Sequence, residues 1–478
     1  MNFWPISVVN SLGVGLIWIG SRMTTTFRLA AALISTTVIF TLAGNAAAAD
    51  ATRPAPRTTE AYVNVPMPPG FQVIVNELEG PVFADAKGRT LYTWPIKAMR
   101  NGYAADPENK SVCGDKIVLK SAGLMSPYPP GLDLPDPEKR VSCIAFWPPV
   151  YADDNAKPVG SWSIITREDG KKQWVYDKHA LYTSTIDRAP GDVLGGSTMA
   201  RRGDSPAARE PAVPPPAIPP GFRVISTVRG RMLLTDSRYS VYASDNDGPN
   251  KSNCIDDCAR TWLPIVAPHS AQAQGEWSIV ERGLGVRQWA FRKKPLYTYS
   301  EDEAAAKLDG GDVPGWHNVY TQIAPAAPKD FTIQATLNGD VLADGRGKTV
   351  YYYSCGEDST DMTPCDTMES PQQYRFAVCG NADVAKCLKT WPYVVATPGV
   401  KSDSRIWSTV WVDPNTGRRA QPNQPGALNV WAYRDRPVYT YALDKAPGDF
   451  YGNNTGEWHG RWNGYQAFWV RDLGGRGG

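Results

Sequence analysis

The sequence predicts an all-β fold of three tandem small modules, each a β-sandwich or a partly closed barrel, joined by Pro-rich linkers. One pattern of Trp, Cys and Tyr residues recurs three times along the 478 residues, and such self-similarity is typical of repeat architectures. Short alternating runs of apolar and polar residues are separated by turn residues, among 43 Gly and 41 Pro, which indicates strands and turns. Helical periodicity is scarce, and this favours an all-β protein.

The recurring pattern starts at a Trp-Pro or Trp-Leu-Pro segment. A second Trp comes 15, 15 and 16 residues later in the three copies, and a third follows a basic, Gly-containing hairpin. These residues are Trp147, Trp162, Trp174, Trp262, Trp277, Trp289, Trp391, Trp407 and Trp431. Large aromatic rings fill much of the interior of a small module, so we expect these Trp residues to form the cores.

Pro-rich stretches mark the boundaries between modules, because such stretches form extended, semi-rigid linkers. The predicted order is a signal peptide at 1–49, a linker at 50–69, modules at 70–198, 221–325 and 326–474, and a linker at 199–220. Each module opens on an expected strand, at Phe71–Val75, Phe222–Ser226 and Phe331–Ala335. In the first and third modules, Asp85 and Asp344 supply turn chemistry for the hairpin that follows.

The N-terminus predicts export. An apolar run from Leu29 to Leu42 precedes Ala47-x-Ala49, which suits cleavage before Asp50, and Met23 is an alternative start. A membrane anchor is the competing interpretation, but the apolar run is short for a span. We therefore expect a periplasmic or secreted protein that meets a membrane only through an uncleaved N-terminus. The oligomeric state is not predicted.

The charge balance gives no indication of nucleic-acid binding. The chain has 50 Lys and Arg and 48 Asp and Glu, and two of the basic residues, Arg22 and Arg28, lie in the signal peptide. The exported chain is then formally neutral, without the basic excess of a nucleic-acid-binding protein.

Eight Cys residues in an exported chain predict disulfides. The repeat favours pairs within a module: Cys113 with Cys143, Cys254 with Cys258, Cys379 with Cys387, and an extra pair, Cys355 with Cys365. Metal binding at Cys254 and Cys258 is the alternative, but no second ligand pair accompanies them, as a closed zinc site requires.

A Tyr-x-aromatic-x-x-Asp motif accompanies the repeat. Tyr297–Asp302 and Tyr439–Asp444 match it fully, and Tyr182–Asp187 and Tyr242–Asp247 match with Ser at the aromatic position. Tyr92-Thr-Trp94 and Tyr351-Tyr-Tyr353 keep the aromatic residue without the Asp. The chain resembles a bacterial family of secreted repeats and predicted lipoproteins that this motif defines. The resemblance implies an envelope or extracellular location and supplies no reaction.

Two roles are open for the motif residues. The Asp residues could accept backbone N–H groups and close the following turn, or the Tyr, Trp and Asp side chains could bind a ligand. The candidate ligand-binding residues are Tyr297, Tyr299, Asp302, Trp316, Tyr439, Tyr441, Asp444 and Trp458.

A metal site is the alternative for a second set. Asp245 and Asp247 precede a Gly in an incomplete calcium-loop pattern, while His317 and His459 each follow a Trp in what the sequence suggests are equivalent positions. No cofactor is predicted. Ca²⁺ or a transition metal at Asp245, Asp247, His317 or His459 is the alternative.

Three functional classes follow. We favour a non-enzymatic exported cell-envelope protein that binds an envelope component, with a glycan as the specific version, through its repeated β modules. The first alternative is a periplasmic redox or metal-handling accessory protein. The second is a glycan-active enzyme, for which the sequence distinguishes no carboxylate pair.

Overall fold

The computed structural model divides the chain into two units, Met1–Ala55 and Pro56–Gly478. The structure describes residues 58–94, 106–115, 142–195, 209–303, 307–336, 338–354, 367–368, 374–380, 383–402, 404–456 and 464–469, all in the second unit. The predicted signal peptide lies outside these residues. No helix in the described part of the chain is long and apolar enough to span a membrane.

The fold is mostly β, in many small antiparallel sheets. The all-β prediction was wrong in one respect, because short helices are present: α1 (Cys143–Phe146), α2 (Asp257–Thr261), α3 (Tyr374–Gly380) and α4 (Val384–Thr390). Three of them, α1, α2 and α4, end immediately before the first Trp of a repeat copy. With four, five and seven residues, they are too short to show helical periodicity in the sequence.

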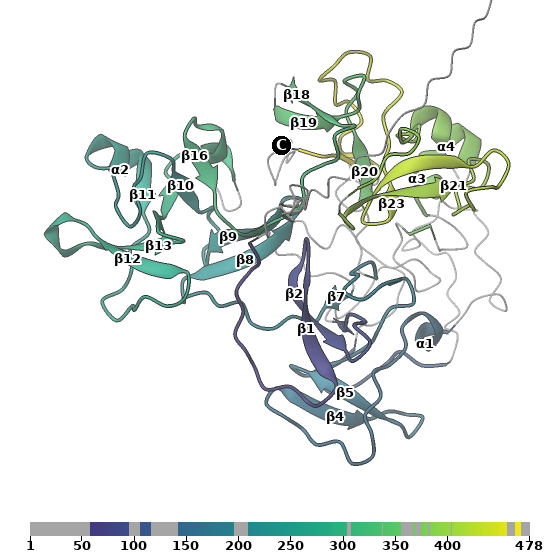
Figure 1. Cartoon of the computed structure of the whole chain (residues 1–478), viewed down its shortest axis with the longest axis horizontal. Coiled ribbons are helices and arrows are strands. Elements are labelled where there is room, and N and C mark those ends of the chain that lie inside the picture. Colours follow the sequence, from purple (N-terminus) through teal and green to yellow (C-terminus); the bar gives the residue numbers. More distant parts are fainter. Residues whose placement is uncertain are drawn as a thin grey trace, which may run out of the picture. The chain divides into compact units, whose positions relative to one another are not determined.

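Three hairpins form from the predicted opening strands (Figure 1). They are β1 (Phe71–Asn76) with β2 (Gly80–Asp85), β8 (Phe222–Thr227) with β9 (Gly230–Thr235), and β18 (Thr332–Thr336) with β19 (Gly339–Ala343). Asp85 Oδ1 accepts the N–H groups of Lys87 and Arg89 at 2.9 and 3.0 Å. Asp344 Oδ1 makes the equivalent bonds to Arg346 and Lys348, which confirms the predicted turn chemistry.

A second type of hairpin begins at the second Trp of each copy (Figure 1). It consists of β4 (Trp162–Thr166), β5 (Lys172–Tyr176) and β6 (His179–Ala180); β12 (Trp277–Glu281), β13 (Arg287–Phe291) and β14 (Lys294–Pro295); or β21 (Trp407–Val412), β22 (Leu428–Tyr433) and β23 (Arg436–Pro437). In each, the second and third Trp of the pattern lie on adjacent strands and share one core.

The motif tyrosines of each copy lie opposite each other on two paired antiparallel strands, an arrangement called here the tyrosine crossing. Tyr92 lies opposite Tyr182, Tyr242 opposite Tyr297, and Tyr351 opposite Tyr439, always antiparallel. The strands involved are β3 (Tyr92–Thr93), β10 (Tyr242–Ser244), β11 (Trp262–Pro264), β15 (Tyr297–Tyr299) and β20 (Tyr351–Ser354).

In each copy, one more strand pairs with the strand that carries the first motif tyrosine. These strands are β7 (Glu210–Pro211) beside β3, β16 (Trp316–Asn318) beside β10, and β25 (Gly464–Ala467) beside β20. Part of the segment predicted as the linker 199–220 is therefore paired with β3. The remaining elements are η3 (Gly283–Gly285), η4 (Asp309–Asp312), β17 (Tyr320–Ile323) and β24 (Thr455–Gly456).

The predicted core role of the repeated Trp residues is confirmed. All nine are at most 6% exposed. Three of the four predicted disulfides are also confirmed, Cys113–Cys143, Cys254–Cys258 and Cys379–Cys387, each with a Cα–Cα distance of 5.2 Å. Cys355 and Cys365 lie outside the described residues.

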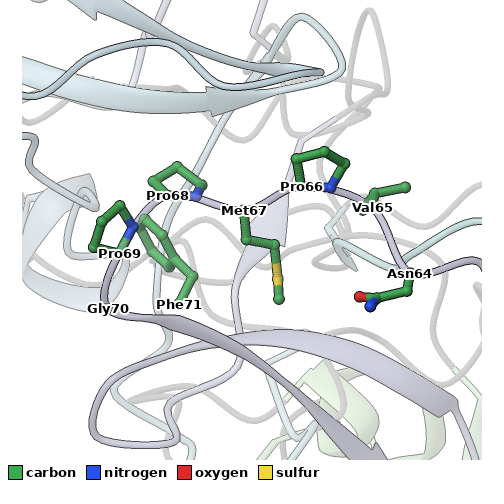
Figure 2. Close-up of a pocket in the computed structure, with 8 residues that line it drawn as sticks. All are labelled: Asn64, Val65, Pro66, Met67, Pro68, Pro69, Gly70 and Phe71. Carbon is green, nitrogen blue, oxygen red and sulfur yellow. The ribbon is translucent and has the colours of Figure 1, made fainter.

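An open depression of about 520 Å³ lies along the segment that precedes β1, and residues 64–71 line it. Figure 2 shows three Pro rings and Phe71 along this segment, with the Met67 side chain on the opposite side from the rings of Pro66 and Pro68. Asn64 is the only polar side chain among the eight lining residues, so the depression offers little chemistry for recognition.

Candidate functional site at the tyrosine and aspartate motifs

The motif Asp residues point inward and accept a hydrogen bond from a buried tyrosine. Tyr92 Oη donates to Asp187 at 2.9 Å. Tyr242 Oη donates to Asp302, and Tyr351 Oη to Asp444, both at 2.7 Å. The three tyrosines have no exposed surface. The same type of hydrogen bond, from a tyrosine hydroxyl to a motif carboxylate, therefore occurs in each of the three copies.

The same carboxylates also close the loop that follows the motif. Each accepts a backbone N–H seven residues later: Asp187 from Leu194 at 2.8 Å, Asp302 from Asp309 at 3.1 Å, and Asp444 from Tyr451 at 3.0 Å. In two of these loops a second carboxylate, Asp192 or Asp449, accepts two N–H groups at the loop's start. The motif carboxylates therefore form hydrogen bonds within the protein, to tyrosine hydroxyls and backbone N–H groups.

A glycine that the sequence analysis missed lies eight residues after each of these three Asp residues. A methyl group on Gly195, Gly310 or Gly452 would lie 2.6–2.9 Å from a buried side chain, the nearest being Ser184, Trp262 and Trp391, respectively. The shared spacing from the motif Asp is the signal that could have revealed these glycines. They let the loop lie directly on the first Trp of each copy.

Replacing Gly310 with alanine is expected to lower the free energy of unfolding by about 1–3 kcal/mol, because the added methyl overpacks the site. Its Cβ would lie 2.9 Å from both the Trp262 and the Tyr242 ring. Gly283→Ala is the matched control, since no atom lies within 4 Å of the added Cβ. Urea unfolding of both variants measures the difference, and equal stabilities would contradict the close packing.

Burial raises the pKa of the inward carboxyl groups. The loss of water raises the pKa of Asp187 to about 7, and that of Asp302 and Asp444 to about 6, against an ordinary value of 3.8. Burial likewise raises the pKa of Tyr242 and Tyr351. The tyrosine hydroxyl therefore stays protonated and acts as the donor.

Two stacks of aromatic rings extend from the first Trp of the second and third copies. Trp262 lies between Trp316, at 3.7 Å, and Tyr299, at 4.4 Å. Trp391 lies between Tyr465, at 3.6 Å, and Tyr441, at 4.4 Å. Trp316 is only 8% exposed and Tyr465 1%, whereas the outer tyrosines, Tyr299 and Tyr441, are partly exposed.

The first copy fills the same space differently. The Arg209 guanidinium lies 3.9 Å from the Trp94 ring and 4.3 Å from the Trp147 ring. By strand register, Arg209 takes the place of Trp316 and Tyr465. Ser184 stands where the other copies have the outer tyrosine.

The predicted equivalence of Trp316–His317 with Trp458–His459 was wrong. Trp316 lies opposite Ser244 of β10, and the residue at the same position of β25 is Tyr465, opposite Tyr353 of β20. His317 lies opposite Ala243 of β10, and Gln466 lies opposite Tyr352, the corresponding residue of β20. His317 is therefore equivalent to Gln466, because strand pairing defines which positions correspond and the shared Trp-His sequence does not. Trp458 and His459 lie outside the described residues.

The remaining metal candidates point in different directions. His317 Nε2 lies 2.8 Å from Asp245 Oδ2 on an exposed surface. Asp247 is 5% exposed and accepts the hydroxyl of Tyr297 and the N–H of Asn253, each at 2.7 Å. Among the described residues, no three His, Cys, Asp or Glu side chains gather at metal-binding distance.

An arginine that the sequence analysis missed is connected by hydrogen bonds, through a serine, to a motif tyrosine in two copies. Arg282 Nη1 donates to Gln288 at 2.7 Å and to Ser252 at 2.6 Å, and the Ser252 hydroxyl lies 2.7 Å from Tyr297 Oη. Arg167, Gln173, Ser111 and Tyr182 repeat these contacts. The signal was an Arg at the start of each hairpin turn and a Ser two residues before the first Cys.

The fold and its hydrogen bonds thus define a β-rich repeat protein, and the three disulfides among the described residues fit an extracytoplasmic location. Residues 429–463 match the family model Lipoprotein_15, a secreted repeat of unknown function. The chain therefore carries one copy of this repeat, which includes the Tyr439–Asp444 motif, and the predicted resemblance is confirmed there. No curated protein and no solved structure is significantly similar to the chain.

Proposed function

We propose that this is a non-enzymatic exported protein of the cell envelope that binds an envelope component through three repeated β modules, at 70–198, 221–325 and 326–474. The recurrence of the same hairpins and the same tyrosine crossing in each range supports this division. The disulfides within each range also support it, because each staples its own small core.

The ligand that fits best is a glycan, and the carrying observation is the outer ring of each aromatic stack. Tyr299 and Tyr441 lie at the partly exposed ends of these stacks, with a Trp ring 4.4 Å behind each and inclined by 29° and 32°. Such a backed ring is a rigid, flat surface. The apolar face of a sugar ring packs on it at little cost in side-chain entropy.

Retention on insoluble bacterial envelope polysaccharide tests the proposal. Each stacked ring is worth about 0.5–1.5 kcal/mol, so Tyr299→Ala with Tyr441→Ala is expected to weaken retention about fivefold or more. Tyr239→Ala, which removes a tyrosine outside these stacks, is the matched control. Circular dichroism verifies that each variant is folded, and equal retention of all three proteins contradicts glycan stacking.

A second candidate, metal handling, has one observation in its favour, the 2.8 Å contact between His317 and Asp245. These side chains are 62% and 65% exposed and are open to a metal ion. Two ligands bind weakly, because stable transition-metal sites use three or four. Metal analysis of the purified protein, with His317→Ala for comparison, separates this candidate from glycan binding.

A further inference from the structure

Two motif copies lie within each proposed module, and they face each other. In the second module, Tyr242 of one motif is paired with Tyr297 of the other across antiparallel strands. Two antiparallel strands are related by a local two-fold axis. A contact that the first strand makes to the second can therefore be repeated by the second strand to the first.

The hydrogen bonds cross between the two motifs. Tyr242 Oη donates to Asp302 of the opposite motif, and Tyr297 Oη donates to Asp247 of the opposite motif, both at 2.7 Å. The first module repeats the exchange, with Tyr92 donating to Asp187 at 2.9 Å and Tyr182 to Asp106 at 2.6 Å. In three of these bonds the tyrosine donates to the motif Asp of the facing motif. Tyr92-Thr-Trp94 has no motif Asp, and Asp106, which follows Tyr92 in the chain, takes the place of Asp247: each accepts the N–H six residues later, at 2.7 Å.

We propose that the motif is half of a folding unit and that the partner it fits is a second copy of the same motif. The tyrosines and carboxylates are buried, Tyr242 and Tyr297 at 0%, Asp302 at 4% and Asp247 at 5%. A buried hydroxyl or carboxylate without a partner is strongly destabilising, so a single motif cannot bury its own polar groups.

The pairing of two motifs concerns how the chain folds and is independent of glycan binding. It gives the matched repeat at 429–463 a definite partner. Asp444 of that repeat accepts from Tyr351, which lies 93 residues earlier and outside the matched range. The repeat is therefore completed by the strand β20, and its boundaries do not coincide with those of a folding unit.

Double-mutant cycles in the full chain test the proposal. The crossed pairs are Tyr242→Phe with Asp302→Ala and Tyr297→Phe with Asp247→Ala. The matched control pairs, Tyr242→Phe with Asp247→Ala and Tyr297→Phe with Asp302→Ala, take both changes from one motif. The measurement is the shift in the midpoint of thermal unfolding for each single and double variant.

For a crossed pair, we expect the double variant to unfold at about the temperature of its less stable single variant, because one bond is lost in either case. For a control pair, the two shifts should add, since two different bonds are lost. Additive shifts in the crossed pairs, or coupling confined to the control pairs, would overturn the proposal. If an alanine variant does not fold, the same cycles with Asp→Leu decide between these outcomes.

Discussion

Replacing Trp391 with alanine is expected to lower the free energy of unfolding by about 3–5 kcal/mol, the usual cost of truncating a buried Trp. The indole is 1% exposed and lies between two rings, with Tyr465 at 3.6 Å and Tyr441 at 4.4 Å. The Tyr351 ring makes a third contact, nearly perpendicular to the indole, with the two ring centroids 5.4 Å apart. Removing the indole leaves a cavity beside the Tyr351 ring, whose hydroxyl donates a hydrogen bond to Asp444 at 2.7 Å.

The matched control is Trp411→Ala on β21. Trp411 is partly exposed and is not among the fully buried Trp residues, so its loss should cost much less. Urea unfolding followed by far-ultraviolet circular dichroism gives both free energies without relying on the removed fluorophore. Comparable losses in the two variants would show that the stack around Trp391 is not a centre of stability.

The sequence predicted the strands and the staples better than the helices. Alternating runs such as Phe71–Val75 became strands because each places one face on a core. The three confirmed disulfide pairs followed from export together with the positions of the Cys residues in the repeat. The helix α2 could not be predicted, because five residues that begin beside the Cys254–Cys258 bridge carry no helical period.

The candidate site was only half predictable, because its central contacts join residues far apart in the chain. The motif gave the spacing between Tyr297 and Asp302, and it suggested that the two act together. In the structure, Asp302 instead accepts a hydrogen bond from Tyr242, which lies 60 residues earlier. Nothing in the local pattern distinguishes these two arrangements, since only the pairing of β10 with β15 selects the crossed one.

The buried carboxyl groups are expected to make the protein more stable near pH 5 than near pH 8. Burial raises the pKa of Asp187 to about 7, and that of Asp106, Asp302 and Asp444 to about 6, from an ordinary 3.8. A carboxyl group whose pKa is higher in the folded state binds its proton more tightly there. Its stabilising contribution is complete below the unfolded pKa and is lost as the pH rises through the folded pKa.

The loss therefore falls between about pH 4 and pH 8, and each unit of pKa difference corresponds to about 1.4 kcal/mol. Asp187→Asn removes the largest of these differences, because the amide does not titrate. The variant should show a smaller fall in thermal midpoint from pH 5 to pH 8 than the parent protein. Thermal unfolding at a series of pH values measures both curves.

Asp449→Asn separates this effect from the titration of other groups, such as the four His residues. The N–H groups of Ala446 and Lys445 hold the pKa of Asp449 below its usual range, so this carboxyl is already ionised at pH 5. Its replacement should leave the difference between pH 5 and pH 8 unchanged. A parent protein equally stable at both values, or a fall of the same size in Asp187→Asn, would mean that the buried tyrosine and aspartate pairs do not take up protons on folding.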